Sequence, residues 1–157
     1  PNWEFWNFKK GETVEGRLFG GCFDIINWQM VAQKYMPTPE KLEGKILALE
    51  TSEESPSETQ VKRWMMCMGE SGLLEKFSAI LVAKPMREPL MGEDKTLEEK
   101  EEYRKQQIET IKQEVERYCP DTPVVFNMDF GHTHPKIPLK LGGKLRVDPE
   151  NERIESL

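Results

Sequence analysis

The sequence predicts an α/β domain with a small parallel sheet, a second antiparallel β layer and helices on one side. Three short apolar runs, at residues 45–49, 79–83 and 124–127, have the length and composition of buried strands. Two amphipathic segments separate these runs, and each is long enough for a right-handed helical crossover between parallel strands. After residue 132 the pattern changes to short alternating runs separated by turn residues, which is typical of antiparallel strands.

The first part of the chain contains a predicted strand, a short helix and a loop, which lead into the first apolar run. Residues 14–19 alternate in polarity and stop at Gly20-Gly21, where we expect a tight turn. Residues 23–30 carry apolar side chains at helical spacing, and two prolines make residues 35–44 a loop. The strand at 45–49 follows this loop.

Two longer helices have clear start signals. Residues 55–58 place a serine at the N-cap, a proline at the first helical position and a glutamate at the third, and the helix they open ends at Gly69. Residues 96–99 form a second capping box, which opens a long helix to Tyr118. Between the strand at 79–83 and this helix, the prolines and glycine of residues 85–95 predict a mobile loop.

Three short runs follow the last apolar strand. Residues 137–141, 144–147 and 153–157 alternate in polarity and are separated by glycines and by an Asp-Pro-Glu-Asn turn. We expect them to be antiparallel strands, and we expect some of them to pair with the strand at 14–19.

Composition limits the class of protein. With 157 residues the chain is most simply one domain, residues 1–157, and it can bury a proper core. The net charge is −6 and the basic residues are interleaved with acidic ones, so we expect no nucleic-acid partner. No apolar run approaches the roughly 20 residues that span a bilayer, so we expect no membrane partner. The aromatic segment at residues 2–8 is interpreted as the end of a piece of a larger protein.

The chain has three cysteines, which form no Cys-x-x-Cys pair. An odd number of unpaired cysteines predicts a reducing, cytoplasmic location rather than a disulfide framework. We interpret Cys22, Cys67 and Cys119 as small buried apolar residues rather than nucleophiles.

Two side chains with catalytic chemistry follow predicted parallel strands. Glu50 comes directly after the strand at 45–49, and His132 follows the strand at 124–127 within Phe-Gly-His. Chemistry in open α/β sheets collects beyond the carboxyl ends of parallel strands, so we expect these two side chains to lie within hydrogen-bonding reach. A carboxylate and an imidazole there suggest the orienting and base members of a hydrolytic triad.

The same histidine segment allows a second hypothesis, which we consider weaker. His132, His134 and Asp129 together could bind zinc, but no third histidine or cysteine motif lies nearby in the sequence. We therefore expect no metal and no cofactor. A nucleophile is also missing, because Ser71 lacks the Gly-x-Ser-x-Gly spacing and the strand-turn-helix context of a nucleophile elbow.

Three motifs, in order and together, resemble the C-terminal domain of the serine LD-carboxypeptidase family, and the closer branch is that of the microcin C immunity peptidases. They are Gly-Arg-Leu-Phe-Gly-Gly-Cys at 16–22, Leu-Ala-Leu-Glu-Thr-Ser-Glu-Glu at 47–54 and Met-Asp-Phe-Gly-His-Thr-His-Pro at 128–135. The resemblance implies a swivelling β/β/α domain. It also implies a Ser-His-Glu triad in which Glu50 and His132 come from this domain and the serine from an N-terminal domain.

We therefore expect residues 1–157 to be the C-terminal half of a two-domain amide hydrolase. The substrate would be a murein peptide or a peptidyl- or aminoacyl-nucleotide, the latter conferring resistance of the microcin C type. Expected partners are its own nucleophile-bearing N-terminal domain, the substrate and a second copy in a homodimer. Without that N-terminal domain the chain should be inactive. The alternative is a non-catalytic binding or regulatory domain that has kept only the fold.

Overall fold

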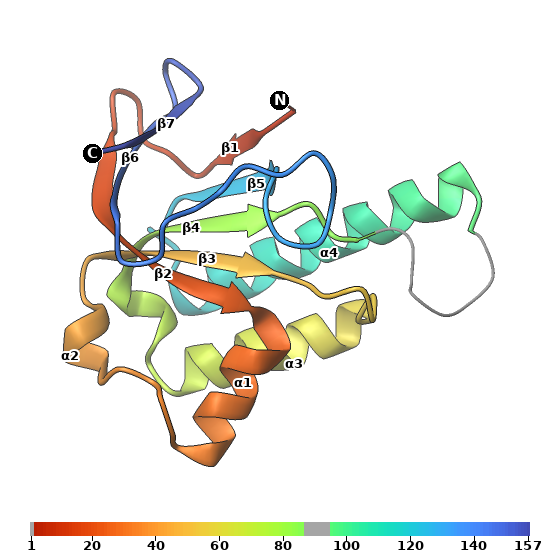
Figure 1. Cartoon of the computed structure of the whole chain (residues 1–157), viewed down its shortest axis with the longest axis horizontal. Helices are drawn as coiled ribbons and strands as arrows, with labels where there is room; N and C mark the ends of the chain where they lie inside the picture. Colours follow the sequence, from red (N-terminus) through yellow and green to blue (C-terminus); the bar gives the residue numbers. More distant parts are fainter. Residues whose placement is uncertain (1, 87–94) are drawn as a thin grey trace.

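The computed structural model describes residues 2–86 and 95–157. Figure 1 shows the chain and its elements. In chain order the elements are β1 (Glu4–Trp6), β2 (Val14–Cys22), α1 (Phe23–Ala32), α2 (Pro39–Leu42), β3 (Lys45–Glu50), α3 (Glu58–Glu70), the 3-10 helix η1 (Leu74–Lys76), β4 (Phe77–Ala83), α4 (Leu97–Tyr118), β5 (Val124–Met128), β6 (Lys144–Asp148) and β7 (Arg153–Ser156).

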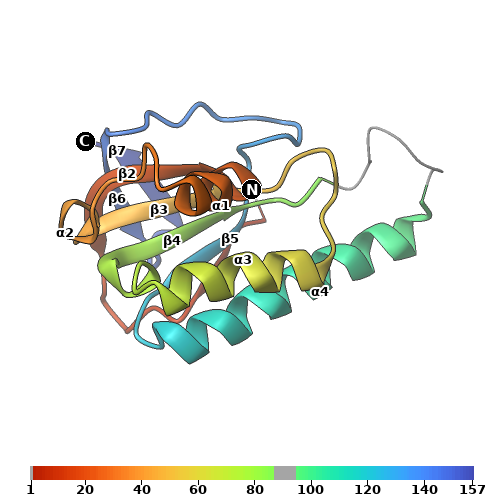
Figure 2. The ribbon, with the colours of Figure 1, turned by 90° about the horizontal axis from the view of Figure 1, so that it is seen from below.

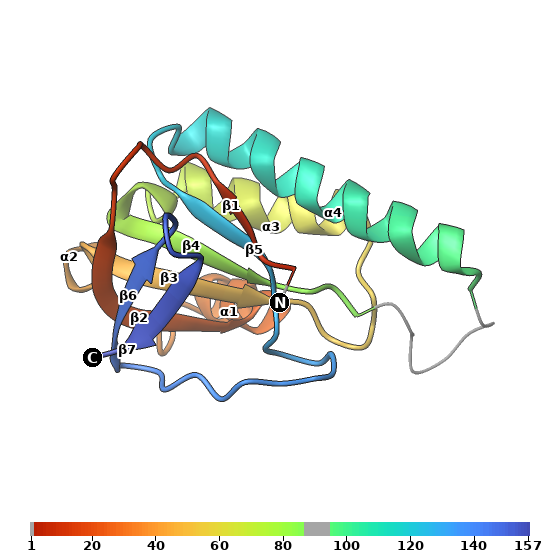
Figure 3. The same cartoon turned by 90° about the horizontal axis from the view of Figure 1, so that it is seen from above.

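Seven strands form one curled sheet in the order β1-β5-β4-β3-β2-β6-β7. The neighbours β2, β3, β4 and β5 are parallel, whereas β1 is antiparallel to β5, and β6 and β7 form an antiparallel ribbon next to β2. Figure 3 shows this ribbon crossing over the parallel strands. The predicted fold class, with a parallel sheet, an antiparallel β layer and helices, is confirmed.

The strand β2 joins the two β layers. Its residues 14–17 pair with β6, and its residues 18–22 pair with β3 as a fourth parallel strand. The tight turn predicted at Gly20-Gly21 is therefore wrong, because the strand continues to Cys22. Both glycines have φ of +152°, and a Cβ on Gly20 would lie 1.9 Å from the carbonyl oxygen of Ala48. Gly20 thus serves a close approach of two backbones, whereas a Cβ on Gly21 would meet nothing within 4 Å.

The two faces of the parallel strands bury separate cores. Helices α3 and α4 cover one face, as Figure 2 shows, and α1 packs against α3. The predicted apolar stripe of α3 is confirmed, since Val61, Met65 and Met68 are fully buried. On the other face Leu145 and Val147 of the β6–β7 ribbon pack on the sheet. Each face therefore has its own cover, which leaves the ends of the strands for chemistry.

The predicted start of one helix and the existence of one predicted strand are wrong. The N-cap of α3 is Ser57, not Ser55, and it forms a capping box with Gln60. Ser55 has φ of +49°, a left-handed conformation that keeps it outside the helix. The run at 137–141 is not a strand, because it pairs with no neighbouring strand and its first amide donates to the carbonyl oxygen of Asp129 at 2.6 Å.

Other predictions hold with small changes. The capping box at residues 96–99 and the long helix to Tyr118 are confirmed. The loop predicted at 35–44 contains the one-turn helix α2. Most of the loop predicted at 85–95 lies outside the described residues. No helix in the described ranges has the length and apolarity that a membrane crossing requires.

Candidate active site

Glu50 and His132 meet at one edge of the sheet, as predicted. Glu50 is the last residue of β3, and His132 follows β5 by four residues. Their side chains are joined by a contact of 2.5 Å between Oε2 of Glu50 and Nδ1 of His132. The glutamate side chain is 12% exposed and the histidine side chain 37%. A shielded carboxylate therefore holds an imidazole that remains open to a reactant.

Gly131 makes this contact possible. Its φ is +82°, a conformation that favours glycine, and a Cβ there would lie 2.7 Å from Oε2 of Glu50. Any larger residue would displace the carboxylate from its place against the imidazole. The glycine beside the histidine thus has a definite packing role.

The second ring nitrogen of His132 also contacts a carboxylate. Its Nε2 lies 3.1 Å from Oε2 of Glu53, whose side chain is 35% exposed. Sequence reasoning missed this contact, because Glu53 reads as part of the solvated loop after Glu50. The contact could have been predicted from the short separation of Glu53 from Glu50 along the chain. A turn after β3 can bring a residue three positions after Glu50 back to the same edge of the sheet.

A buried ion pair fixes the backbone that leads to His132. Asp129 is 7% exposed, its carboxylate forms an ion pair with Lys84, and it accepts a hydrogen bond of 3.0 Å from the Trp3 indole nitrogen. Burial raises the pKa of Asp129, but hydrogen bonds from Lys84 and Trp3 outweigh it and hold this pKa below its usual value. The carboxylate of Asp129 is therefore engaged with Lys84 rather than with His132.

The structure does not assemble the alternative zinc site. His132 is bound to Glu50 and Glu53, and Asp129 is bound to Lys84 and Trp3. Over the described ranges, no group of three histidine, cysteine, aspartate or glutamate side chains has the proximity to hold a metal ion.

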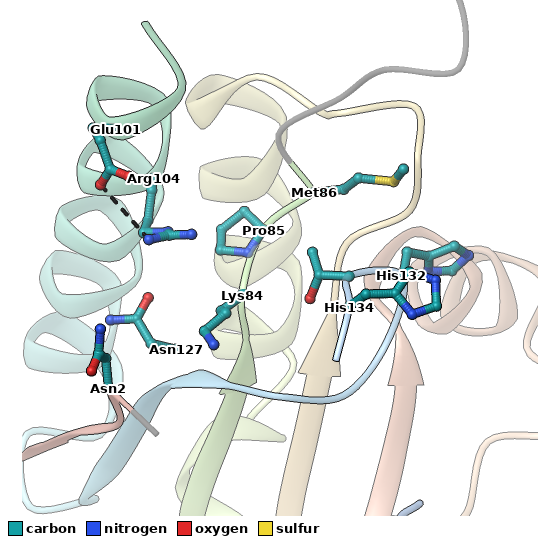
Figure 4. A pocket seen from close by; sticks show the side chains of 10 residues that line it. Asn2, Lys84, Pro85, Met86, Glu101, Arg104, Asn127, His132 and His134 are labelled. Atoms are coloured by element: carbon teal, nitrogen blue, oxygen red, sulfur yellow. Dashed lines mark ion pairs between the residues drawn. The ribbon is translucent and has the colours of Figure 1, made fainter. Parts of the chain in front are cut away.

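An open cleft of about 680 Å³ lies beside His132 (Figure 4). His132 and His134 lie on one side of it, Arg104 of α4 on the other, and Lys84 between them. Arg104 forms an ion pair of 3.7 Å with Glu101. The cleft is large enough for a small polar ligand and places that ligand next to the imidazole.

The cysteines and Ser71 have other roles. The Sγ of Cys22 lies 2.7 Å from a carboxylate oxygen of Asp24, and burial, with the nearby carboxylates, raises the pKa of this thiol well above its usual value. A protonated thiol is a poor nucleophile. The prediction that all three cysteines are buried is wrong, because Cys67 is exposed and Cys22 half-buried. The Ser71 hydroxyl donates to the Cys67 carbonyl oxygen at 2.8 Å, which caps the end of α3.

Comparisons with known proteins agree with this fold. The family model of the LD-carboxypeptidase C-terminal domain matches residues 15–147. The microcin C7 self-immunity protein MccF of Escherichia coli is 28% identical over 143 residues, which cover 90% of this chain and 36% of MccF.

Solved structures of relatives share the fold. A MccF-like protein from Streptococcus pneumoniae in complex with AMP matches with a TM-score of 0.78 and 24% identity, over 98% of this chain and 43% of the other. MccF in complex with aspartyl sulfamoyl adenosine matches with a TM-score of 0.72 and 27% identity, over 98% of this chain and 40% of the other. The chain therefore spans less than half the length of these relatives.

Proposed function

Because this chain belongs to the family of LD-carboxypeptidase C-terminal domains, we propose that it supplies the glutamate and the histidine of a Ser-His-Glu amide hydrolase. The observation that supports the proposal most strongly is the contact of 2.5 Å between Glu50 and His132 at the ends of two parallel strands. The serine lies outside residues 1–157, in a domain that packs against this edge of the sheet. That domain is the partner we propose for the chain, together with a second copy in a homodimer.

Each ring nitrogen of His132 has its own task in the proposed mechanism. Nδ1–H donates to Glu50, which fixes the tautomer and leaves the lone pair of Nε2 for the serine. Nε2 takes the serine proton as the oxygen attacks the amide carbonyl, and the imidazolium gives that proton to the leaving amine as the bond to carbon breaks. Water then takes the place of the serine hydroxyl: it attacks the acylated serine, gives its proton to Nε2 and releases the acid. Glu50 stays ionised and stabilises the imidazolium throughout.

The substrate that we propose is an aminoacyl- or peptidyl-nucleotide, and the bond that is cleaved is the amide or acyl bond between the two parts. MccF is a microcin C7 self-immunity protein, and it has been seen with aspartyl sulfamoyl adenosine. The open cleft beside His132 offers space and polar side chains for such a ligand. A murein peptide with an L-to-D amide bond is the second candidate, supported by the description of the family.

The chain alone is expected to show no turnover of either substrate, because its Ser71 hydroxyl is engaged in the cap of α3 and its Cys22 thiol stays protonated. The measurement compares the purified chain with the chain joined to its nucleophile domain, on a murein tetrapeptide and on an aminoacyl sulfamoyl adenosine. Hydrolysis should occur only in the joined form. Turnover by the chain alone would contradict the proposal, whether or not it survives Ser71→Ala. Absence of turnover in the joined form would favour a binding or regulatory domain.

A further inference from the structure

We propose that Glu53 selects the acyl group of the substrate by binding a free α-ammonium, an inference that rests on the function proposed above. Glu53 lies in the turn after β3, with its Oε2 3.1 Å from Nε2 of His132. Glu50 occupies the opposite nitrogen, Nδ1. Glu53 is thus the carboxylate beside the one nitrogen that exchanges protons with the nucleophile and the leaving group.

The charge of Glu53 limits what it can do there. A carboxylate cannot stabilise the oxyanion that forms on the carbonyl oxygen, because like charges repel. Its favourable partner is a cation, and across the described part of the chain no lysine or arginine forms an ion pair with it. Its side chain is 35% exposed, about three times as much as the 12% of Glu50, so a ligand can reach it.

The distances match an ammonium on the carbon next to the scissile carbonyl. That nitrogen lies two bonds from the carbonyl carbon, roughly 2.5 Å away. The carbonyl carbon itself sits about 3 to 3.5 Å from the attacking oxygen, which is hydrogen-bonded to Nε2. The α-ammonium therefore lies at most about 9 Å from Nε2, and an acyl group oriented toward the turn after β3 brings it to the carboxylate of Glu53.

This arrangement links recognition of the substrate to release of the base. Before the substrate arrives, the carboxylate of Glu53 occupies Nε2 of His132. The contact between Glu53 and Nε2 needs a proton on Nε2. When the α-ammonium offers the carboxylate a full positive charge, Glu53 turns to the ligand, that proton passes to solvent, and the lone pair of Nε2 then faces the nucleophile. A residue whose α-nitrogen is acylated, as inside a murein peptide, offers no charge and leaves Glu53 on the imidazole. The chain should therefore prefer aminoacyl groups with a free amine.

The test is the hydrolysis of alanyl sulfamoyl adenosine and of its N-acetyl derivative by the chain joined to its nucleophile domain. Glu53→Gln keeps the shape and removes the charge, and Glu54→Gln removes the same charge from the neighbouring exposed position. Glu53→Gln should lower kcat/KM on the free amine by about 10- to 100-fold, mainly through KM, as expected for a lost charge-assisted contact. On the N-acetyl derivative Glu53→Gln should not lower kcat/KM, because Glu53 there contacts only the imidazole and not the substrate. Glu54→Gln should change kcat/KM by no more than about twofold on both substrates.

Two results would overturn this inference while leaving the proposed function standing. The first is an equal loss on both substrates after Glu53→Gln, which would mean that Glu53 acts on His132 and not on the ligand. The second is an unchanged kcat/KM on the free amine. By contrast, a wild-type enzyme that cleaves neither substrate would refute the proposed function, and the inference with it.

Discussion

His132→Ala is expected to abolish turnover in the enzyme that joins this chain to its nucleophile domain, with a loss of about 10⁵- to 10⁶-fold in kcat. In the proposed mechanism the imidazole accepts the serine proton and returns it to the leaving amine, and among the described residues His132 is the one histidine with a hydrogen bond to Glu50. The side chain is 37% exposed, so its removal should leave the fold intact. Steady-state kinetics, with circular dichroism as the check on folding, measure both effects.

His134→Ala is the matched control. His134 lines the same cleft but lies two residues further along, with no contact to Glu50. We expect kcat to fall by no more than a few-fold, roughly the effect of a lost ligand contact. If His134→Ala were as damaging as His132→Ala, and if added zinc changed the rate, the metal hypothesis would displace the triad.

Glu50→Gln is expected to lower kcat by about ten thousandfold, close to 5 kcal/mol of barrier, while KM changes little. In the proposed mechanism the carboxylate accepts a hydrogen bond from Nδ1–H, whose nitrogen lies 2.5 Å from Oε2, and stabilises the imidazolium. A glutamine amide has nearly the same shape, but it carries no charge and its N–H₂ group can hold the ring in the wrong tautomer. The measurement is kcat and KM on the same aminoacyl sulfamoyl adenosine.

The control for this variant is its stability. Glu50 is largely shielded, and Gly131 packs directly against it, so a change in its contacts could disturb the fold. A thermal unfolding midpoint within a few degrees of the wild type would show that the loss of rate is chemical. A rate within tenfold of the wild type, with the fold intact, would mean that Glu50 does not orient the catalytic base.

The sequence predicted correctly those strands, helix ends and site residues that depend on the pattern of a short segment. The three apolar runs predicted β3, β4 and β5, and their parallel order predicted that Glu50 and His132 would share an edge. The parallel order of the strands and the shared edge both follow from the right-handed crossovers that amphipathic helices form between parallel strands. The capping box at residues 96–99 was predicted correctly, whereas the N-cap of α3 lies two residues later than predicted because Ser55 adopts a left-handed conformation.

Three of the features that were missed depend on contacts between distant residues. The course of β2 is set by its pairing with β3 and β6, so Gly20-Gly21 was predicted as a turn although the strand continues through it and Gly20 serves a close backbone approach. The Trp3–Asp129 hydrogen bond joins residues 126 positions apart, and nothing in the sequence connects them. The contact between Glu53 and His132 depends on both the turn after β3 and the loop after β5.

The central claim is that this chain brings the base and its orienting carboxylate to a serine in another domain. The most direct measurement is the site of covalent labelling by a fluorophosphonate, located by peptide mass spectrometry in the joined enzyme. We expect a single labelled serine outside residues 1–157, with labelling strongly slowed by His132→Ala. A label on Ser71 or on another residue of this chain, or labelling that proceeds equally fast without His132, would contradict it.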